Sequence, residues 1–208
     1  MRRIFVTGID TNIGKTVIAA ILTEALEADY WKPIQAGNLS FTDTDLVRKL
    51  VSNEISVLHP EAYRLREPLS PHAAAAAEGV AIDMERIRTV LPDTHGRDLI
   101  IEGAGGAMSP VNESMVMLDL IKSLDAQAVI VSKHYLGSIN HTLLTIDAMR
   151  RRDLPIVGVF FNGKPVKSSV DFILRYSGVK PLGYVDEEEI LDREVVRKYA
   201  QMFRREFR

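Results

Sequence analysis

A nine-residue segment near the N-terminus, residues 8–16, constrains the fold of this chain more than any other feature. It reads GIDTNIGKT and lies between an apolar run, residues 4–6, and a helix-compatible run, residues 17–26. A glycine-bearing loop that ends in Gly-Lys-Thr between a strand and a helix is typical of a phosphate-binding P-loop. Backbone N–H groups of such a loop and the helix N-terminus hold phosphate oxygens. We therefore expect Lys15 to reach the β- and γ-phosphates and the Thr16 hydroxyl to reach Mg²⁺.

One detail of this loop departs from the common pattern. The first glycine, Gly8, stands one position early, so Ile9 occupies the usual glycine position. A bare Gly-Lys-Thr also occurs at the capped start of an ordinary helix, which is the alternative interpretation. The strand before the loop and the helix after it favour the P-loop.

Strand-like apolar runs alternate with helical patterns along the rest of the chain. The expected strands are residues 4–7, 30–34, 99–102, 128–131, 156–161 and 182–184. The expected helices are residues 15–27, 43–50, 72–78, 84–90, 115–124, 138–151, 169–176 and 192–207. Several strands are continuous β-branched runs, as expected of parallel strands covered on both faces. The order predicts one α/β domain, residues 1–208, with a doubly wound, mostly parallel sheet flanked by helices and ligands at the strands' carboxyl ends.

Composition excludes several classes of function. The chain has 208 residues, a net charge of −2 and no cysteine. Disulfides, cysteine metal sites and thiol nucleophiles are therefore excluded, and no nucleic-acid surface is expected. No apolar run approaches membrane-spanning length, and Met1-Arg2-Arg3 leads directly into a strand, so we expect neither a membrane segment nor a signal peptide. These features are typical of a cytoplasmic protein.

Two charged residues stand at the ends of expected strands. Glu102 opens the segment Gly103-Ala104-Gly105-Gly106, where a carboxylate would face the ligand crevice and suit Mg²⁺. The alternative for Glu102 is a turn with an exposed side chain. Lys32 lies within an expected buried strand, where a lysine is costly unless it meets an anion. It could face the γ-phosphate opposite Lys15, but Pro33 leaves an edge-strand lysine equally open.

Three further segments carry polar groups that suit ligand binding. Asp43 is a natural helix N-cap, and Asp45 could reach a metal from the first turn, although capping is the preferred interpretation of both. Residues 137–140 start a helix after a strand, so their free N–H groups could bind an anion beside an ordinary N-cap. Asn162 ends a strand, and its amide can read a nucleobase edge, although Asn before Gly163 is also typical of a turn.

Together these segments resemble the dethiobiotin synthetases, the ATP-dependent ligases of biotin synthesis. The resemblance runs from Gly8 to Asn162 and more weakly to Gly183. It depends on residues 8–16, Lys32-Pro33, Asp45, residues 67–72, residues 102–106 with Pro110, and residues 137–141. Many nucleotide-binding proteins share the P-loop, but the ordered set with this spacing is specific.

The resemblance implies a substrate, a reaction and a set of site residues. The diamine 7,8-diaminopelargonic acid reacts with CO₂ to give a carbamate, which is phosphorylated by ATP and closed to a cyclic urea by the second amine. The implied catalytic residues are Lys32, Lys15 and Thr11, and the implied Mg²⁺ ligands are Thr16, Asp45 and Glu102. The implied ATP site comprises Asn12, Ile13, Gly14, Lys15, Thr16, Val17, Asp45, Glu102, Gly103, Ala104, Gly105, Asn162 and Gly163. The implied substrate site comprises Thr11, Lys32, Ala36, Ser70, Gly137, Ser138, Ile139 and Asn140, with the helix start supplied across a homodimer interface.

Some positions depart from the family, and other P-loop classes remain as alternatives. Ala36 stands where the family often has Ser, and three acids, residues 186–188, fall where a base-contacting loop is expected, so the base preference stays open. A partitioning or septum-placement switch ATPase would carry a second lysine early in the loop, where Asp10 stands. A glutaminase-coupled ligase needs a cysteine nucleophile, which this chain lacks, and a nucleotide kinase usually needs an arginine-rich lid, whereas the dense arginine clusters here lie at expected helix ends.

Overall fold

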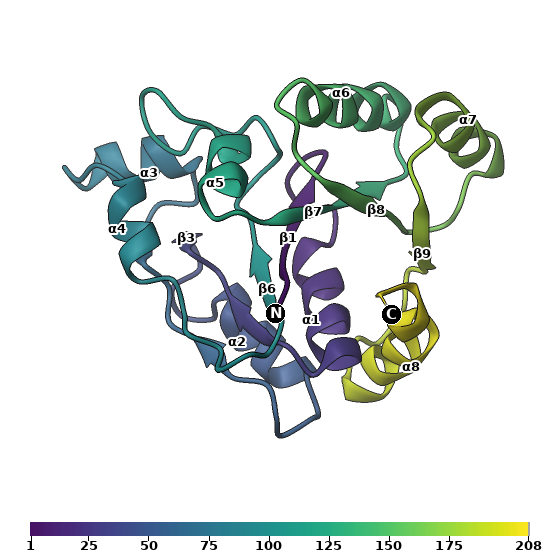
Figure 1. The fold of residues 1–208 in the computed structure, drawn as a ribbon, viewed down its shortest axis with the longest axis horizontal. Helices are drawn as coiled ribbons and strands as arrows, with labels where there is room; N and C mark the ends of the chain where they lie inside the picture. The colour runs from purple at the N-terminus through teal and green to yellow at the C-terminus, as the bar shows by residue number, and fades with distance from the viewer. Residues whose placement is uncertain (208) are drawn as a thin grey trace.

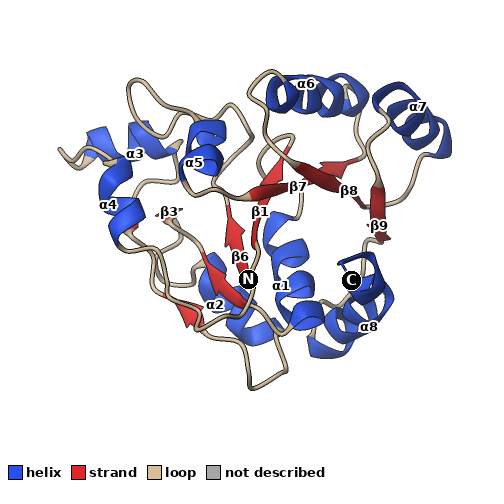
Figure 2. Ribbon diagram, in the orientation of Figure 1, coloured by secondary structure: helices blue, strands red, loops and turns tan. Residues whose placement is uncertain are grey.

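The computed structural model describes residues 1–207, in which strands and helices alternate along the chain (Figures 1 and 2). The strands are β1 (Arg3–Gly8), β2 (Asp29–Trp31), β3 (Ile34–Ala36), β4 (Leu58–His59), β5 (Tyr63–Leu65), β6 (Leu99–Glu102), β7 (Gln127–Lys133), β8 (Ile156–Asn162) and β9 (Pro181–Val185). The helices are α1 (Lys15–Leu26), α2 (Asp43–Leu50), α3 (Pro71–Ala77), α4 (Met84–Thr89), α5 (Met117–Ser123), α6 (Ser138–Arg150), α7 (Lys167–Ser177) and α8 (Arg193–Phe203), followed by a 3₁₀ turn, Arg204–Phe207.

A seven-stranded sheet with the order β4-β2-β6-β1-β7-β8-β9 forms the middle layer. Every neighbouring pair in it is parallel. The chain first forms β2 and β4 on one side of β1, returns as β6 between β2 and β1, and then adds β7, β8 and β9 on the other side, so the predicted doubly wound fold is confirmed. Strands β6, β1 and β7 lie in the middle of the sheet, and their carboxyl ends therefore meet at one edge.

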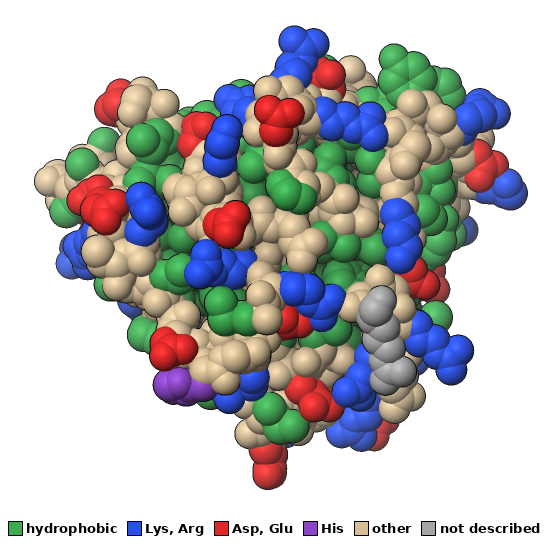
Figure 3. Space-filling view, in the orientation of Figure 1, with side chains coloured by type: hydrophobic (Ala, Val, Ile, Leu, Met, Phe, Trp, Pro, Cys, Tyr) green, Lys and Arg blue, Asp and Glu red, His purple; other side chains and the backbone are tan. Residues whose placement is uncertain are grey.

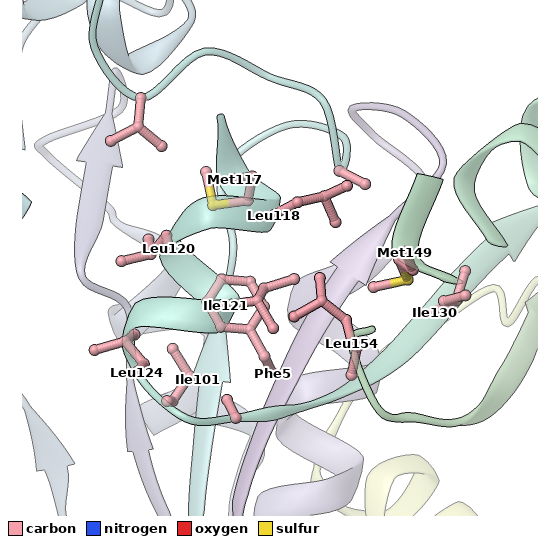
Figure 4. Packing of buried hydrophobic residues seen from close by; sticks show 14 of the residues in the cluster. Phe5, Ile101, Met117, Leu118, Leu120, Ile121, Leu124, Ile130, Met149 and Leu154 are labelled. Atoms are coloured by element: carbon pink, nitrogen blue, oxygen red, sulfur yellow. The ribbon is translucent and has the colours of Figure 1, made fainter. Parts of the chain in front are cut away.

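Helices cover both faces of this sheet, and alternate residues of each strand are buried against opposite layers. Ile4 and Val6 of β1 pack toward α1, α2 and α8, whereas Phe5 packs toward α3 to α7. Figure 4 shows Phe5 among side chains of α5, including Ile121 and Leu118. Figure 1 shows these two layers on either side of the strands. Burial on both faces explains why the strands are continuous apolar runs.

The predicted strand over residues 30–34 was wrong, because it is two strands that belong to different sheets. Strand β2 ends at Trp31, and β3 begins at Ile34 and pairs only with β5 in a separate two-stranded sheet. Pro33 cannot donate a ladder hydrogen bond, and it restricts the backbone of Lys32 before it. Lys32 therefore lies beyond the end of β2. Strands β4 and β5, of two and three residues, were not predicted.

The surface carries both signs of charge. On the face drawn in Figure 3, basic and acidic side chains are interspersed among apolar ones. Among the helices of residues 1–207, we find none with the length and apolar character needed to cross a bilayer.

Candidate active site

The loop between β1 and α1 has the backbone of a P-loop. Asn12 and Gly14 adopt positive φ angles of 53° and 91°, so the chain turns sharply before α1 begins at Lys15. A Cβ atom on Gly14 would lie 2.1 Å from Nδ2 of Asn162, so this position requires glycine on two grounds. A Cβ atom on Gly8 would lie 2.3 Å from the side chain of Ile13, which explains the early glycine that the sequence shows.

A cavity of about 710 Å³ opens beside this loop, at the carboxyl ends of β1, β2 and β6. Many of the predicted site residues line it together: residues 11–17 and 103–105, with Lys32, Ala36, Ser70 and Glu102. Their convergence follows from the topology, because the three strands end at the same edge of the sheet.

Glu102 is the centre of a buried polar network at the base of the cavity. Its side chain is 1% exposed, and its Oε1 atom accepts hydrogen bonds from Thr16 Oγ1 at 2.8 Å and from Lys32 Nζ at 2.9 Å. Its Oε2 atom accepts from the Tyr30 hydroxyl at 2.9 Å. Lys32 Nζ also lies 2.6 Å from Oδ2 of Asp43. Two carboxylates and the Gly103 carbonyl, which lies 3.4 Å from Lys32 Nζ, therefore surround one positively charged group.

The pKa values of the two lysines in the cavity shift in opposite directions, although burial lowers both. Desolvation lowers the pKa of Lys15 to about 8, because nearby Glu102 offsets only part of the cost. Its ammonium donates to the Asp10 carbonyl at 2.8 Å, inside the P-loop. Desolvation also lowers the pKa of Lys32, but the carboxylates of Glu102 and Asp43 outweigh it and raise that pKa overall. Lys32 is therefore charged at neutral pH, and an anion bound beside Lys15 would raise the lowered pKa of Lys15.

The structure brings Asp43, and not Asp45, to Glu102 and Lys32. The N-cap of α2 is Thr42, and Asp43 is the first helical residue, so the expectation of an Asp43 cap was wrong. Oδ2 of Asp45 accepts the Thr42 N–H and hydroxyl, both at 3.0 Å, and Oδ1 accepts from Arg48 at 2.6 Å. This capping box fixes the Asp45 carboxylate on its own helix turn and outside the cavity, because Asp45 does not line it.

Asn162 and Gly163 lie beside the P-loop rather than in the cavity wall. Asn162 ends β8, and its Nδ2 donates to the Ile13 carbonyl at 2.8 Å. The Asn162 amide therefore has its oxygen free of any hydrogen bond that we observe within residues 1–207, next to the phosphate loop.

The helix start at residues 137–140 does not join the cavity of its own chain. Gly137 is the N-cap of α6, with a φ angle of 102°, and Ser138 begins the helix. None of residues 137–140 lines the cavity beside the P-loop. The predicted substrate site is therefore not assembled within one copy of residues 1–207.

Several side chains near the ligand cavity were not predicted from the sequence. Gln35 is 2% exposed, and its amide donates to the Gly37 carbonyl and accepts from the Asp43 N–H. Tyr30 donates to Glu102, as described above. A polar side chain in an apolar segment was the available signal for both, but apolar neighbours favoured a structural interpretation. Residues 1–207 contain no cluster of three or more His, Asp or Glu side chains suited to a metal.

A P-loop that faces paired lysines and carboxylates at the carboxyl edge of a parallel sheet defines a P-loop nucleotide-binding protein. A family model described as an AAA domain matches residues 2–195. Among solved structures, the MinD cell division protein of Aquifex aeolicus superposes with a TM-score of 0.63 at 14% identity, covering 97% of this chain and 96% of that one. A ParA family ATPase from Chlorobium tepidum gives 0.60 at 13% identity, covering 96% and 98%. Identities this low show the fold alone.

Relatives with much higher sequence identity identify the family within this class of P-loop proteins. The ATP-dependent dethiobiotin synthetase BioD of Cytophaga hutchinsonii is 50% identical over 200 residues, which is 96% of each chain. The synthetase of the same name from Christiangramia forsetii is 47% identical and covers 97% of this chain and 95% of its own. That of Novosphingobium aromaticivorans is 44% identical over all 208 residues and 98% of its own length. This chain belongs to the ATP-dependent dethiobiotin synthetase family.

Proposed function

We propose that this chain is an ATP-dependent ligase that carboxylates 7,8-diaminopelargonic acid with CO₂ and closes the cyclic urea of dethiobiotin. The observation that carries this function is the 50% identity to a dethiobiotin synthetase over 96% of both chains. The cavity beside the P-loop supports it, because residues predicted for ATP and for substrate line the same cavity.

The reaction proceeds in three steps. One amine of the substrate adds to CO₂ and loses a proton, which gives a carbamate. A carbamate oxygen then attacks the γ-phosphorus of ATP, and ADP leaves as the new oxygen–phosphorus bond forms. The second amine attacks the carbamate carbon of this mixed anhydride and loses a proton, and inorganic phosphate leaves as the ring closes. Phosphorylation is needed because an unmodified carbamate oxygen is a poor leaving group.

The lysines of the cavity neutralise charge during these steps. Lys15, at the start of α1, would leave the Asp10 carbonyl and bind the phosphates. Lys32, whose pKa is raised by two carboxylates although burial opposes this, carries a full charge toward the carbamate and the transferred phosphoryl group. Thr11 lines the same cavity at the P-loop and would contact the carbamate. Catalysis is then largely positioning and electrostatic stabilisation.

The donor set around Lys32 suits a magnesium ion, with Asp43 in the place for which Asp45 was expected. Thr16, Glu102 and Asp43 offer only oxygen atoms, and Mg²⁺ is commonly held by one or two carboxylates together with substrate phosphates. The ammonium of Lys32 already lies between these carboxylates, which indicates that the site accepts a cation. Magnesium, when bound, supplies neutralisation of phosphate charge.

The substrate site is completed in this proposal by a second copy of the chain. The N–H groups at the start of α6, residues 137–140, would bind the distal carboxylate of the diamine across a two-fold interface. Their absence from the cavity wall of their own chain supports this arrangement. The adenine would be read by Asn162, and the enzyme would act in the cytoplasm.

Phosphate release tests the proposed reaction. ATP, Mg²⁺ and bicarbonate are incubated with the protein, with and without 7,8-diaminopelargonic acid, and the product is identified by mass. We expect phosphate release that depends on the diamine, with an equal amount of cyclic urea. Release that is indifferent to the diamine would instead indicate a switch ATPase of the kind that shares this fold.

The choice between two neighbouring carboxylates tests the magnesium site. Asp43→Asn removes a carboxylate charge 2.6 Å from Lys32, whereas Asp45→Asn disrupts only the capping box of the same helix. We expect the first variant to require a higher Mg²⁺ concentration for half-maximal activity. The second should lose about 1 kcal/mol of stability and keep the wild-type Mg²⁺ requirement. The reverse pattern would restore Asp45 as the ligand.

A further inference from the structure

Tyr30 is a buried side chain that neither the reaction nor the core requires to be a tyrosine. Its exposed fraction is 0%, and its ring packs in the layer that contains α1. A phenylalanine would fill the same apolar volume without burying a hydroxyl group, which is costly unless the hydroxyl is hydrogen-bonded. Its hydroxyl donates to Oε2 of Glu102 at 2.9 Å. The Tyr30 hydroxyl therefore contributes a hydrogen bond to Glu102, whereas the packing requires only the ring.

The sheet register explains how Tyr30 reaches Glu102. Tyr30 of β2 lies beside Ile100 of β6, and Glu102 is two residues further along the same strand. Residues two apart in a strand point to the same face, so both side chains lie on the α1 side of the sheet. Thr16, in the first turn of α1, meets Glu102 from that same side. Strands β2 and β6 and helix α1 thus bring Tyr30, Glu102 and Thr16 into contact.

The hydrogen bonds divide the Glu102 carboxylate into two unlike oxygens. Oε2 accepts from Tyr30, in the closed interior. Oε1 accepts from Thr16 and Lys32, at the wall of the cavity. A free carboxylate can rotate about its last side-chain torsion, and hydrogen bonds to both Oε1 and Oε2 of Glu102 restrict that rotation.

We propose that Tyr30 is a positioning residue that fixes the Glu102 carboxylate, so that Oε1 is presented to the cation bound with the nucleotide. This role rests on the proposed function of Glu102 as a magnesium ligand. Side chains that hydrogen-bond a ligating carboxylate orient it, and their loss typically lowers metal affinity or activity by 10–100-fold.

Tyr30→Phe tests this role, because it removes one hydroxyl and keeps the ring. Tyr63→Phe is the matched control: Tyr63 is 7% exposed, and its hydroxyl accepts from the backbone N–H of Asp83, away from the cavity. Mn²⁺, which takes the same oxygen ligands as Mg²⁺, is titrated into each variant saturated with ADP, and free Mn²⁺ is read by electron paramagnetic resonance. Thermal melting and metal-free ADP binding verify the fold of each variant.

We expect Tyr30→Phe to weaken Mn²⁺ binding about 10-fold, with metal-free ADP affinity unchanged. The Mg²⁺ concentration for half-maximal activity should rise while KM for the diamine stays constant. Tyr63→Phe should lose similar thermal stability and keep its Mn²⁺ affinity. Unchanged Mn²⁺ affinity in folded Tyr30→Phe, equal to that of the control, overturns the positioning role.

Glu102→Gln separates failure of this inference from failure of the proposed site. If Glu102→Gln weakens Mn²⁺ binding and Tyr30→Phe does not, Glu102 is a ligand that needs no positioning by Tyr30. If neither variant changes Mn²⁺ affinity, the magnesium assignment of Glu102 is itself wrong, and the role of Tyr30 is overturned with it.

Discussion

Replacing Lys32 by methionine removes an ammonium that lies between two carboxylates at the base of the cavity. Its Nζ atom is 2.6 Å from Asp43 and 2.9 Å from Glu102, and the lysine is 4% exposed. Methionine keeps much of the volume and loses the charge. The buried Glu102 is then left without its ion-pair partner, which is the costly way to break a buried pair.

The expected loss of unfolding free energy depends on the interactions that Glu102 and Asp43 retain without Lys32. Breaking a buried ion pair from one side usually costs about 3–5 kcal/mol. Glu102 retains its hydrogen bonds from Thr16 and Tyr30, and the Asp43 side chain is 36% exposed and can be hydrated. Both features favour the low end, so we expect Lys32→Met to lose about 3 kcal/mol of unfolding free energy without divalent cations.

Urea unfolding in EDTA measures this loss, and Lys167→Met is the control. The Lys167 ammonium belongs to an ion pair on the surface of α7, where it is 88% exposed, so its removal should barely change the midpoint. Adding Mg²⁺ with ADP should stabilise Lys32→Met more than it stabilises the wild-type protein, because a cation can replace the missing ammonium. Turnover should be lost. An unfolding free energy in EDTA equal to that of the wild type would refute the proposed ion-pair role of Lys32.

Three further predictions follow from the site and the sheet. Lys15→Ala should abolish phosphate release and leave the circular dichroism spectrum intact, since within residues 1–207 the Lys15 ammonium donates only to the Asp10 carbonyl; near-normal turnover would remove Lys15 from the mechanism. Asn162→Ala should lower ADP affinity about tenfold in calorimetry but leave the affinity for inorganic tripolyphosphate, which has no base, unchanged. Equal losses of affinity for both ligands would exclude base recognition by Asn162. Asp29 accepts from Arg97 and His59, and although burial raises its pKa, these bonds lower it overall, so its folded pKa lies below the unfolded value. Its stabilisation is therefore present above about pH 4 and lost as pH falls through the folded pKa, so Asp29→Asn should cost about 1.5–3 kcal/mol at pH 7 and little in acid. A cost independent of pH would contradict that account.

The sequence was sufficient for the P-loop and the sheet because both depend on local patterns. A phosphate loop needs its glycines, its lysine and its threonine within nine neighbouring positions, and residues 8–16 contain them all. Continuous apolar runs identify strands that are buried on both faces, which is how β1, β6, β7 and β8 were predicted. The two-residue strand β4 and the three-residue strand β5 are too short to show any period.

The expectation that Asp43 caps its helix was wrong for a different reason, which is the angle between neighbouring positions on a helix. Each residue turns an α-helix by about 100°, so a one-residue error in the cap changes which side chain faces a neighbour. The cap is Thr42 rather than Asp43, and Asp43 consequently points to Lys32 while Asp45 closes the capping box. Thr42 and Asp43 are both good N-cap residues, but only Thr42 has a carboxylate three residues later, that of Asp45, to complete a capping box. This local signal was present in the sequence and favours Thr42.

The net charge of the cavity lining suggests a function for the ion pairs of Lys32. Among the residues that the structure describes, two lysines and two carboxylates line the cavity, Lys15 and Lys32 with Asp43 and Glu102, and their charges balance without a ligand. A triphosphate adds several negative charges that this balanced set cannot neutralise while Lys32 is bound to both carboxylates. In the proposed magnesium site, a divalent cation that arrives with the nucleotide would hold Asp43 and Glu102 and release Lys32 for phosphate or carbamate. On that proposal, the ion pairs of Lys32 couple its action on substrate to the joint arrival of nucleotide and divalent cation.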